Sequence, residues 1–294
     1  MEFRVLQYFL AVAREQSVSG AAEYLHLSQP TLSRQLKDLE EELGKQLFIR
    51  GNRKITLTDE GMTLRKRAEE IVQLVKKTED EIILSDDSLS GNIYIGAGET
   101  DAVRILARAA NQVQASYPKI CFHISSGDAT DVIEQLDKGL LDFGVLFEPT
   151  DLSEYNYLRI PAKDEWGVLM RRDAPLSEKR MIIPEDLWDK PLIVSRQAVN
   201  KSRGLFEWLG KEPDELNIVA TYNLLFNGSL MVEERMGYAL CLNHIINSTG
   251  ESNLCFRPLS PKLETRLNVV WKKYQMLSKP AEKFLEKLQE LIKT

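Results

Sequence analysis

The spacing of four leucines near the N-terminus constrains this chain more than any other feature. They are separated by four, three and four residues, which places them on one face of an α-helix: Leu32, Leu36, Leu39 and Leu43. The opposite face carries short polar or basic side chains: Pro30, Ser33, Arg34 and Lys37. Ser28 can cap this helix and Gly44 can end it. The segment therefore predicts a helix with a buried leucine stripe and a polar, basic outer face.

Two further helices are predicted before this one. Apolar residues recur at helical spacing in the first: Leu6, Phe9, Leu10 and Ala13. Ser17 can cap a second, alanine-rich helix at Val18–Leu25. The turn Leu25–Gln29 then gives the spacing of a helix-turn-helix, in which a polar, basic helix face suits contact with bases and phosphates in a major groove. The alternative is a small helical bundle with an ordinary solvated face.

A β-hairpin is predicted directly after the third helix. Gln46–Arg50 and Arg53–Thr58 alternate in the manner of strands, and Gly51 and Asn52 form the turn between them. The hairpin is basic at its tip, where it carries Arg50, Arg53 and Lys54. It therefore has the position and charge of a wing beside the third helix.

The overall charge argues mildly against a nucleic-acid partner. The chain has a formal net charge of −6 and a pI of about 5.4. Acidic and basic residues nearly balance over residues 1–60, but the basic ones gather on the outer helix face and the hairpin. Because binding depends on local neutralisation of phosphates, a near-neutral domain with clustered bases can still bind DNA. We expect modest affinity from one copy and a need for two.

A long helix with a heptad repeat follows. Between Gly61 and Ser90 the sequence has neither proline nor glycine, and apolar positions alternate at four and three residues: Leu64, Ala68, Ile71, Val75, Thr78 and Ile82. This period is that of a coiled-coil seam. Residues 65–67 are basic and residues 79–81 acidic, which favours an antiparallel pair. The helix therefore predicts a dimer, and residues 86–91 predict a hinge loop.

From Asn92 onward short apolar strands alternate with helices. Strands are expected at Ile93–Gly96, Cys121–Ser125, Leu141–Phe147, Trp166–Met170, Pro191–Ser195, Ile218–Tyr222, Gly237–Leu242 and Leu267–Trp271. Helices are expected at Ala102–Ser116, Asp131–Lys138 and Lys279–Ile292. This order predicts an α/β domain with mostly parallel strands.

One motif imitates a dinucleotide-binding loop. Gly96 and Gly98 follow a strand as the first two glycines of G-x-G-x-x-G would. The third position is Asp101, whose carboxylate would obstruct helix–strand packing and repel a pyrophosphate. We therefore expect no dinucleotide and no other cofactor.

A ligand cleft is expected where the strands end, because ligands of open α/β sheets bind beyond the carboxyl ends of their strands. The side chains at these ends are Thr100, Asp128, Phe147, Ser195 and Arg196. With Glu99 and Asp101 nearby, Asp128 could accept a hydrogen bond from an amino or hydroxyl group of an effector. Equally, it could cap the helix that begins near Ala129. Both interpretations stay open.

Catalytic and metal-binding patterns are missing from the sequence. His26, His123 and His244 lack metal-ligand spacing, and no G-x-S-x-G, H-E-x-x-H, P-loop or paired-carboxylate arrangement occurs. Three cysteines are too few and too scattered for a disulfide framework: Cys121, Cys241 and Cys255. We expect no metal and no enzyme activity.

The first sixty residues resemble the DNA-binding domain of the bacterial LysR-type transcriptional regulators. The matching run is Phe9, Val12, Ala13, Ser17, Ala21, Ala22, Leu25, Ser28, Gln29, Pro30, Ser33, Leu36, Leu39, Glu40, Leu43, Gly44, Leu47, Phe48, Arg50, Arg53, Leu57, Thr58 and Gly61, in register over more than fifty residues. The resemblance implies a winged helix-turn-helix that reads DNA with Ser28, Gln29, Pro30, Thr31, Ser33, Arg34 and Lys37 from the helix and with Arg50, Arg53 and Lys54 from the wing.

The resemblance also implies the organisation of the whole chain. A periplasmic-binding-protein-like effector domain of two Rossmann-like subdomains would follow the linker helix, with crossover strands near Ile160–Lys163 and Thr265–Asn268. The expected division is 1–58 for the winged helix-turn-helix, 59–90 for the dimerisation helix and hinge, 91–161 with 267–294 for subdomain I, and 162–266 for subdomain II. In this family a hydroxyl residue at the position of Thr100 commonly contacts the effector, and Asp128 replaces a second frequent hydroxyl.

We therefore expect a sequence-specific DNA-binding regulator controlled by a small-molecule effector. Its expected partners are promoter or operator DNA, the effector, a second copy in a dimer or tetramer, and RNA polymerase, but no membrane. The N-terminus lacks the features of a signal peptide, so the expected location is the cytoplasm. Some family members sense peroxide with a cysteine pair, yet Cys241 and Cys255 have no adjacent bases, which favours inert thiols. A solute-binding receptor and an enzyme with a DNA-binding appendage are the alternatives.

Overall fold

The computed structural model describes residues 1–51, 54–83, 89–201 and 203–293. The chain divides into two compact units, Met1–Ile83 and Leu84–Thr294. The predicted turn residue Asn52, the wing residue Arg53 and much of the predicted hinge lie outside the described residues. Along the part of the chain that is described, no helix is both long and apolar enough to cross a lipid bilayer.

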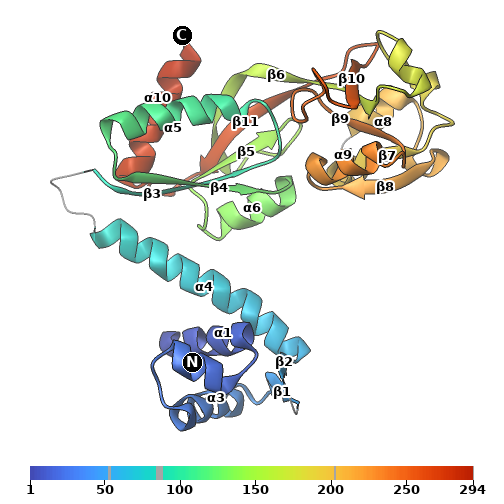
Figure 1. Ribbon diagram of the computed structural model, residues 1–294. Helices are drawn as coiled ribbons and strands as arrows, with labels where there is room; N and C mark the ends of the chain where they lie inside the picture. The colour runs from blue at the N-terminus through green and yellow to red at the C-terminus, as the bar shows by residue number, and fades with distance from the viewer. Residues whose placement is uncertain (52–53, 84–88, 202, 294) are drawn as a thin grey trace. The chain divides into compact units, whose positions relative to one another are not determined.

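The N-terminal unit contains the predicted helices and hairpin (Figure 1). Its elements are α1 (Phe3–Glu15), α2 (Val18–Tyr24), α3 (Gln29–Leu43), β1 (Phe48–Arg50), β2 (Ile55–Leu57) and α4 (Asp59–Ile83). The Ser17 side chain accepts a hydrogen bond from the amide of Gly20, and that of Ser28 accepts one from Thr31, so both predicted N-caps are confirmed. Gly44 ends α3 in the left-handed conformation, with φ of 62°.

The core of this unit forms where α1, α2 and α3 meet. Leu32, Leu36 and Leu39 are buried in it, as the leucine spacing predicted. Leu43 is 41% exposed, so the prediction that it continues the buried stripe was wrong. It is the last residue of α3, where the chain already turns away at Gly44.

A carboxylate ties α3 to the wing. Glu40 Oε1 accepts hydrogen bonds from the backbone amides of Leu47, at 2.7 Å, and Phe48, at 3.1 Å. Gly61 approaches the same segment so closely that a Cβ atom there would lie 2.2 Å from the Leu47 carbonyl oxygen. Only glycine fits this contact, which seats the start of α4 against the wing.

Helix α4 contributes to the core of its own unit. Ala68 is fully buried in that core, and Leu64 packs against it. Because Ala68 is used inside the protomer, the prediction that it belongs to the coiled-coil seam was wrong, whereas Leu64 is only half-buried. The later seam positions Ile71 and Ile82 are exposed, at 38% and 76%.

The C-terminal unit is built on one mixed sheet with the order β4-β3-β5-β11-β6-β9-β7-β8, and β10 also pairs with β6. The strands are β3 (Gly91–Ala97), β4 (Ile120–Ser126), β5 (Phe143–Phe147), β6 (Tyr155–Arg171), β7 (Leu192–Ser195), β8 (Ile218–Tyr222), β9 (Tyr238–Leu242), β10 (Leu254–Pro258) and β11 (Glu264–Lys272). Strand β3 is parallel to β4 and β5, and β7 is parallel to β8 and β9.

The middle of the sheet departs from the predicted parallel pattern. Strand β11 is antiparallel to both β5 and β6, and β6 is antiparallel to β9 and β10. Strand β6 runs through both halves of the sheet, since its first part, Tyr155–Glu165, pairs with β11 and its last part, Trp166–Arg171, pairs with β9 and β10. Strand β11 lies between β6 and β5 and links them. They are the crossover strands that the resemblance implied.

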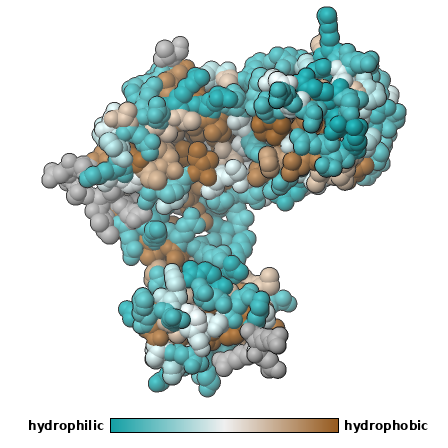
Figure 2. All heavy atoms as spheres, viewed as in Figure 1, coloured by the Kyte–Doolittle hydropathy of each residue, from teal (hydrophilic) through white to brown (hydrophobic). Residues whose placement is uncertain are grey.

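Helices cover both faces of each half. They are α5 (Val103–Ser116), α6 (Ala129–Asp137), α7 (Arg196–Lys201), α8 (Arg203–Leu209), α9 (Leu225–Glu233) and α10 (Lys279–Lys293). In the first half α5 and α10 pack together on one face of the sheet and α6 lies on the other (Figure 1). Separate hydrophobic clusters fill the two halves, and hydrophilic residues cover most of the visible surface (Figure 2). Each half therefore has its own core.

Candidate functional site

The outer face of α3 presents the residues predicted to read DNA. Its exposed members are Ser28, Gln29, Pro30, Thr31, Arg34 and Lys37, and Ser33 is half-buried. The Arg34 side chain is 82% exposed and lies 3.9 Å from Asp38, whereas Lys37 Nζ lies 3.1 Å from Glu41. Exposed ion pairs of this kind are weak, so DNA phosphates can replace Asp38 and Glu41 as partners of the two cations. The face is polar, basic and open to a partner.

The wing is held beside α1. The amide of Ile55 donates to the carbonyl of Gln16 at 3.0 Å, and Lys54 is exposed next to it. Arg50 ends β1, but its side chain lies outside the described residues, as does the whole of Arg53. Of the basic cluster predicted for the wing, the structure thus places only the Lys54 side chain.

The C-terminal part of α4 carries exposed apolar side chains. Besides Ile71 and Ile82, the residue Leu74 is 42% exposed. A shallow groove is lined by Leu74, Val75, Thr78, Glu79 and Ile82. Leu74 was missed because a strict heptad reading passes from Ile71 to Val75, although Leu74 borders the same face.

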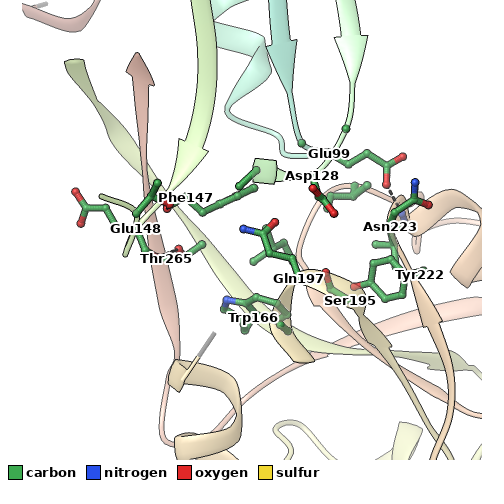
Figure 3. A pocket seen from close by; sticks show the side chains of 18 of the residues that line it. Glu99, Asp128, Phe147, Glu148, Trp166, Ser195, Gln197, Tyr222, Asn223 and Thr265 are labelled. Carbon is green, nitrogen blue, oxygen red and sulfur yellow. Dashed lines mark hydrogen bonds between the residues drawn. The ribbon is translucent and has the colours of Figure 1, made fainter. Parts of the chain in front are cut away.

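A cavity of about 450 Å³ lies where the two halves of the C-terminal unit face each other (Figure 3). Loops that follow β3, β4 and β5 form one wall, and residues after β7 and β8 form the other. The lining residues include Gly98, Glu99, Asp128, Phe147, Glu148, Asp151, Trp166, Ser195, Gln197, Tyr222, Asn223, Leu225 and Thr265. A volume of this order suits a small molecule.

Three of the residues predicted for the effector cleft line this cavity, namely Asp128, Phe147 and Ser195. Arg196 is not among the lining residues but reaches Asp128. Thr100 does not line it either, so the expectation that Thr100 faces the cleft was wrong. Its buried hydroxyl donates a hydrogen bond to Asp164 on β6 and accepts one from the amide of Ala102 at 3.0 Å.

Asp128 is occupied by the protein itself. Its Oδ1 accepts hydrogen bonds from the amides of Thr130 and Asp131 at the start of α6, as the helix-cap interpretation predicted. Its Oδ2 accepts from Arg196 Nη2 at 2.6 Å, which links α6 to α7. Burial opposes ionisation of this carboxyl, but Arg196 and the two amides outweigh it and lower the pKa of Asp128.

Glu99 makes a second contact between the two halves. Its carboxylate accepts a hydrogen bond from the backbone amide of Leu225, the first residue of α9. The side chain of Leu224, at the N-cap of α9, provides no cap of its own. Glu99 therefore serves as the acidic cap of a helix that lies far away in sequence, an arrangement that stabilises the positive end of the helix dipole.

Burial makes the Cys241 and Cys255 thiols harder to ionise. Burial raises the pKa of Cys241 to about 12 and also raises the pKa of Cys255. Both are buried free thiols, whereas Cys121 is exposed. Among the described residues, no group of three or more His, Cys, Asp or Glu side chains is arranged to hold a metal ion. These environments favour inert thiols at Cys241 and Cys255.

Two family models match this chain. Residues 3–62 match the model described as "Bacterial regulatory helix-turn-helix protein, lysR family", and residues 86–293 match the one described as "LysR substrate binding domain". The chain belongs to the LysR family of transcriptional regulators. As a LysR-type regulator it combines a DNA-binding helix-turn-helix domain with an effector-binding α/β domain.

Two curated relatives align with nearly the full length of this chain. It is 29% identical to the HTH-type transcriptional regulator BsdA of Bacillus subtilis over 303 residues, 97% of this chain and 99% of that protein. It is 28% identical to the Hca operon transcriptional activator HcaR of Escherichia coli over 288 residues, 96% of this chain and 94% of that protein.

The fold is shared with solved LysR structures. Full-length CbnR complexed with its target DNA has a TM-score of 0.75 at 19% identity, covering 99% of this chain and 100% of that one. At this identity the likeness shows the architecture alone. It agrees with the winged helix-turn-helix and the two-part α/β domain described above.

Proposed function

We propose that this LysR-type regulator binds operator DNA through the outer face of α3 and the wing. The observation that carries the proposal is the polar, basic face of α3, where Arg34 and Lys37 are exposed and held only by weak pairs. CbnR has been solved with its target DNA, which supports a DNA-reading role for this fold. Contact with the promoter would place the protein in the bacterial cytoplasm, and contact with RNA polymerase stays a prediction.

We further propose that two copies pair through the exposed apolar face of α4 and that a small molecule bound in the cavity controls them. The cavity lies between two halves joined by β6 and β11, so a ligand that touches both halves favours one of their arrangements. Such a ligand shifts the equilibrium only by its difference in affinity for the two arrangements. The residues proposed to surround it are Asp128, Phe147 and Ser195, with Arg196 acting through its pair with Asp128. The relatives are transcriptional regulators, which supports a role without catalysis.

A gel-shift titration tests the DNA-binding proposal. The full-length protein is titrated against a duplex from the region upstream of its own gene, and Arg34→Ala is compared with wild type. We expect Arg34→Ala to weaken binding by about 1–3 kcal/mol if Arg34 contacts a base, or to lower the salt slope by about 1 if it contacts a phosphate.

Arg4→Ala is the matched control, because it removes the same charge from an exposed position on α1. It should leave operator affinity nearly unchanged. Equal losses in the two variants, or no sequence-selective binding by wild type, would contradict the proposed interface.

A further inference from the structure

We propose that the cavity of the effector domain binds an organic cation that carries an apolar or aromatic group. This inference rests on the proposed function, since it names the class of ligand for the same cavity. Four carboxylates line the cavity: Glu99, Asp128, Glu148 and Asp151. Among the described lining residues there is no lysine, arginine or histidine. The charge of the walls therefore has one sign.

Two of these carboxylates are neutralised by arginines. Asp128 pairs with Arg196 at 2.6 Å, and Glu148 pairs with Arg159 at 2.9 Å. In Figure 3 the Glu148 carboxylate also points away from the other labelled side chains. These two acids therefore add little net charge to the cavity.

Glu99 and Asp151 differ from these two acids in their partners. In the described part of the chain, Glu99 accepts from the Leu225 amide, and exposed Asp151 accepts from Ser153, whose amide lies 2.9 Å from Asp151 Oδ1. Neither has a basic partner among the residues that the structure describes. A cation that enters this space gains from both carboxylates, and an anion is repelled by both.

The start of α9, one of the helices that begin at the cavity, offers no binding position to an anionic ligand. The backbone amide of Leu225 begins α9, where a ligand carboxylate could otherwise be held. The Glu99 carboxylate already accepts from that amide. The protein thus supplies its own anion at this point, so a ligand group placed there is better matched if it is a cation.

The remaining walls suit the uncharged part of such a ligand. Phe147, Trp166 and Tyr222 provide aromatic faces, and further apolar surface comes from Ile133, Ala198, Leu242 and Ile245. A cation over an aromatic ring, tryptophan above all, is stabilised by the ring quadrupole. Gln197 points into the same space in Figure 3, and its amide has no hydrogen-bond partner within the described chain. An ammonium group beside a carboxylate and a hydrocarbon part against the aromatic side chains would use both kinds of wall.

Three probes of similar size and different charge test this inference on the full-length protein: phenethylamine, 2-phenylethanol and 3-phenylpropionate. Binding is measured by calorimetry and by tryptophan fluorescence, with Trp166→Phe used to assign the optical signal to the cavity. We expect phenethylamine to bind about tenfold or more tightly than the alcohol, and the carboxylate to bind least. Equal affinities, a preference for the carboxylate, or no binding of phenethylamine at millimolar concentration overturns the proposal.

Glu99→Gln separates charge from structure, because its amide oxygen can still accept from Leu225. We expect it to weaken phenethylamine about tenfold and to leave the alcohol unchanged. Glu251→Gln, an exposed site outside the cavity lining, is the matched control and should have no effect. Loss of all three probes in Glu99→Gln would indicate a folding role and overturn the assignment of Glu99.

The gel shift distinguishes the two proposals. Operator binding without any response to phenethylamine in either assay leaves the DNA-binding function standing and removes the cation. Binding of phenethylamine by a protein that shows no sequence-selective DNA binding would support the cation site and contradict the DNA-binding function.

Discussion

At the scale of single residues, Asp164 shows how crossover strand β6 is joined to the loop that follows β3. It is buried on β6 and accepts a hydrogen bond from Thr100, which follows β3. Burial is the main cause that raises the pKa of Asp164, and it outweighs the lowering effect of the Thr100 hydroxyl. The hydroxyl that the family resemblance assigned to an effector here holds an internal carboxylate.

This carboxyl makes stability depend on pH in a defined direction. Because its folded pKa lies above the ordinary value of 3.8, its contribution is present below that value and is lost as pH rises through the folded pKa. Asp164→Asn keeps an acceptor for Thr100 and cannot ionise. We expect wild type to lose more unfolding free energy than this variant as pH rises from 3.8 through the folded pKa, measured by urea denaturation. Asp214→Asn, on the exposed surface, should follow wild type, and identical pH profiles for wild type and Asp164→Asn would contradict this account.

At the scale of elements, local sequence signals account for most helices and strands. The signals for α3 each lie within a few residues of sequence: Ser28 at its N-cap, Gly44 at its end and the leucine spacing between them. Helix α3 begins and ends where they indicate. Contacts between distant segments were not readable. The link from Glu99 to Leu225 depends on where β8 and α9 bring that amide, and burial of Ala68 depends on how α1 packs on α4.

The strands show the same limit. Short apolar runs located β3, β7 and β8, but β6 begins at Tyr155, well before the expected Trp166. Its first half is mostly exposed, with only Tyr155, Ile160 and Asp164 buried, so the apolar signal is weak there. Strand direction also could not be inferred from apolar runs, which is why the antiparallel centre of the sheet was missed.

The exposed face of α4 predicts how copies associate. Leu74→Asp places a charge among Leu74, Val75 and Ile82, which would have to be buried in a dimer. We expect the dimer dissociation constant to rise by about tenfold or more, measured by analytical ultracentrifugation. Gln73→Asp, also exposed on α4 but outside the groove, adds the same charge and should leave association intact. An unchanged dimer in Leu74→Asp would exclude this face.

At the scale of the whole molecule, polar contacts beside the cavity join the halves of the effector domain. Among the described residues they include the Arg196–Asp128 pair, the longer Arg196–Asp131 pair and the Glu99–Leu225 hydrogen bond. The Arg196 side chain is 51% exposed, so solvent screens the pair and it holds the halves together only weakly. A weak closure of this kind can be shifted by a ligand of modest affinity.

Arg196→Gln should therefore favour a more open arrangement of the two halves. Exposed Cys121 and an added Glu251→Cys can be spin-labelled on opposite halves, whereas Cys241 and Cys255 are buried. We expect Arg196→Gln to lengthen or broaden the distance distribution measured by electron paramagnetic resonance. Lys190→Gln breaks an exposed pair within one half and serves as the control. Identical distributions would show that the pair does not restrain the domain.

The double hydrogen bond from Glu40 to the amides of Leu47 and Phe48 has a consequence for how an operator is read. It ties the recognition helix to the start of the wing within one protomer. Under the proposed function, an effector would therefore change the spacing between two DNA-binding domains and not the shape of either one. Half-sites about 34 Å apart, one turn of the duplex, would be bound when that spacing places both recognition helices on the same side of the DNA.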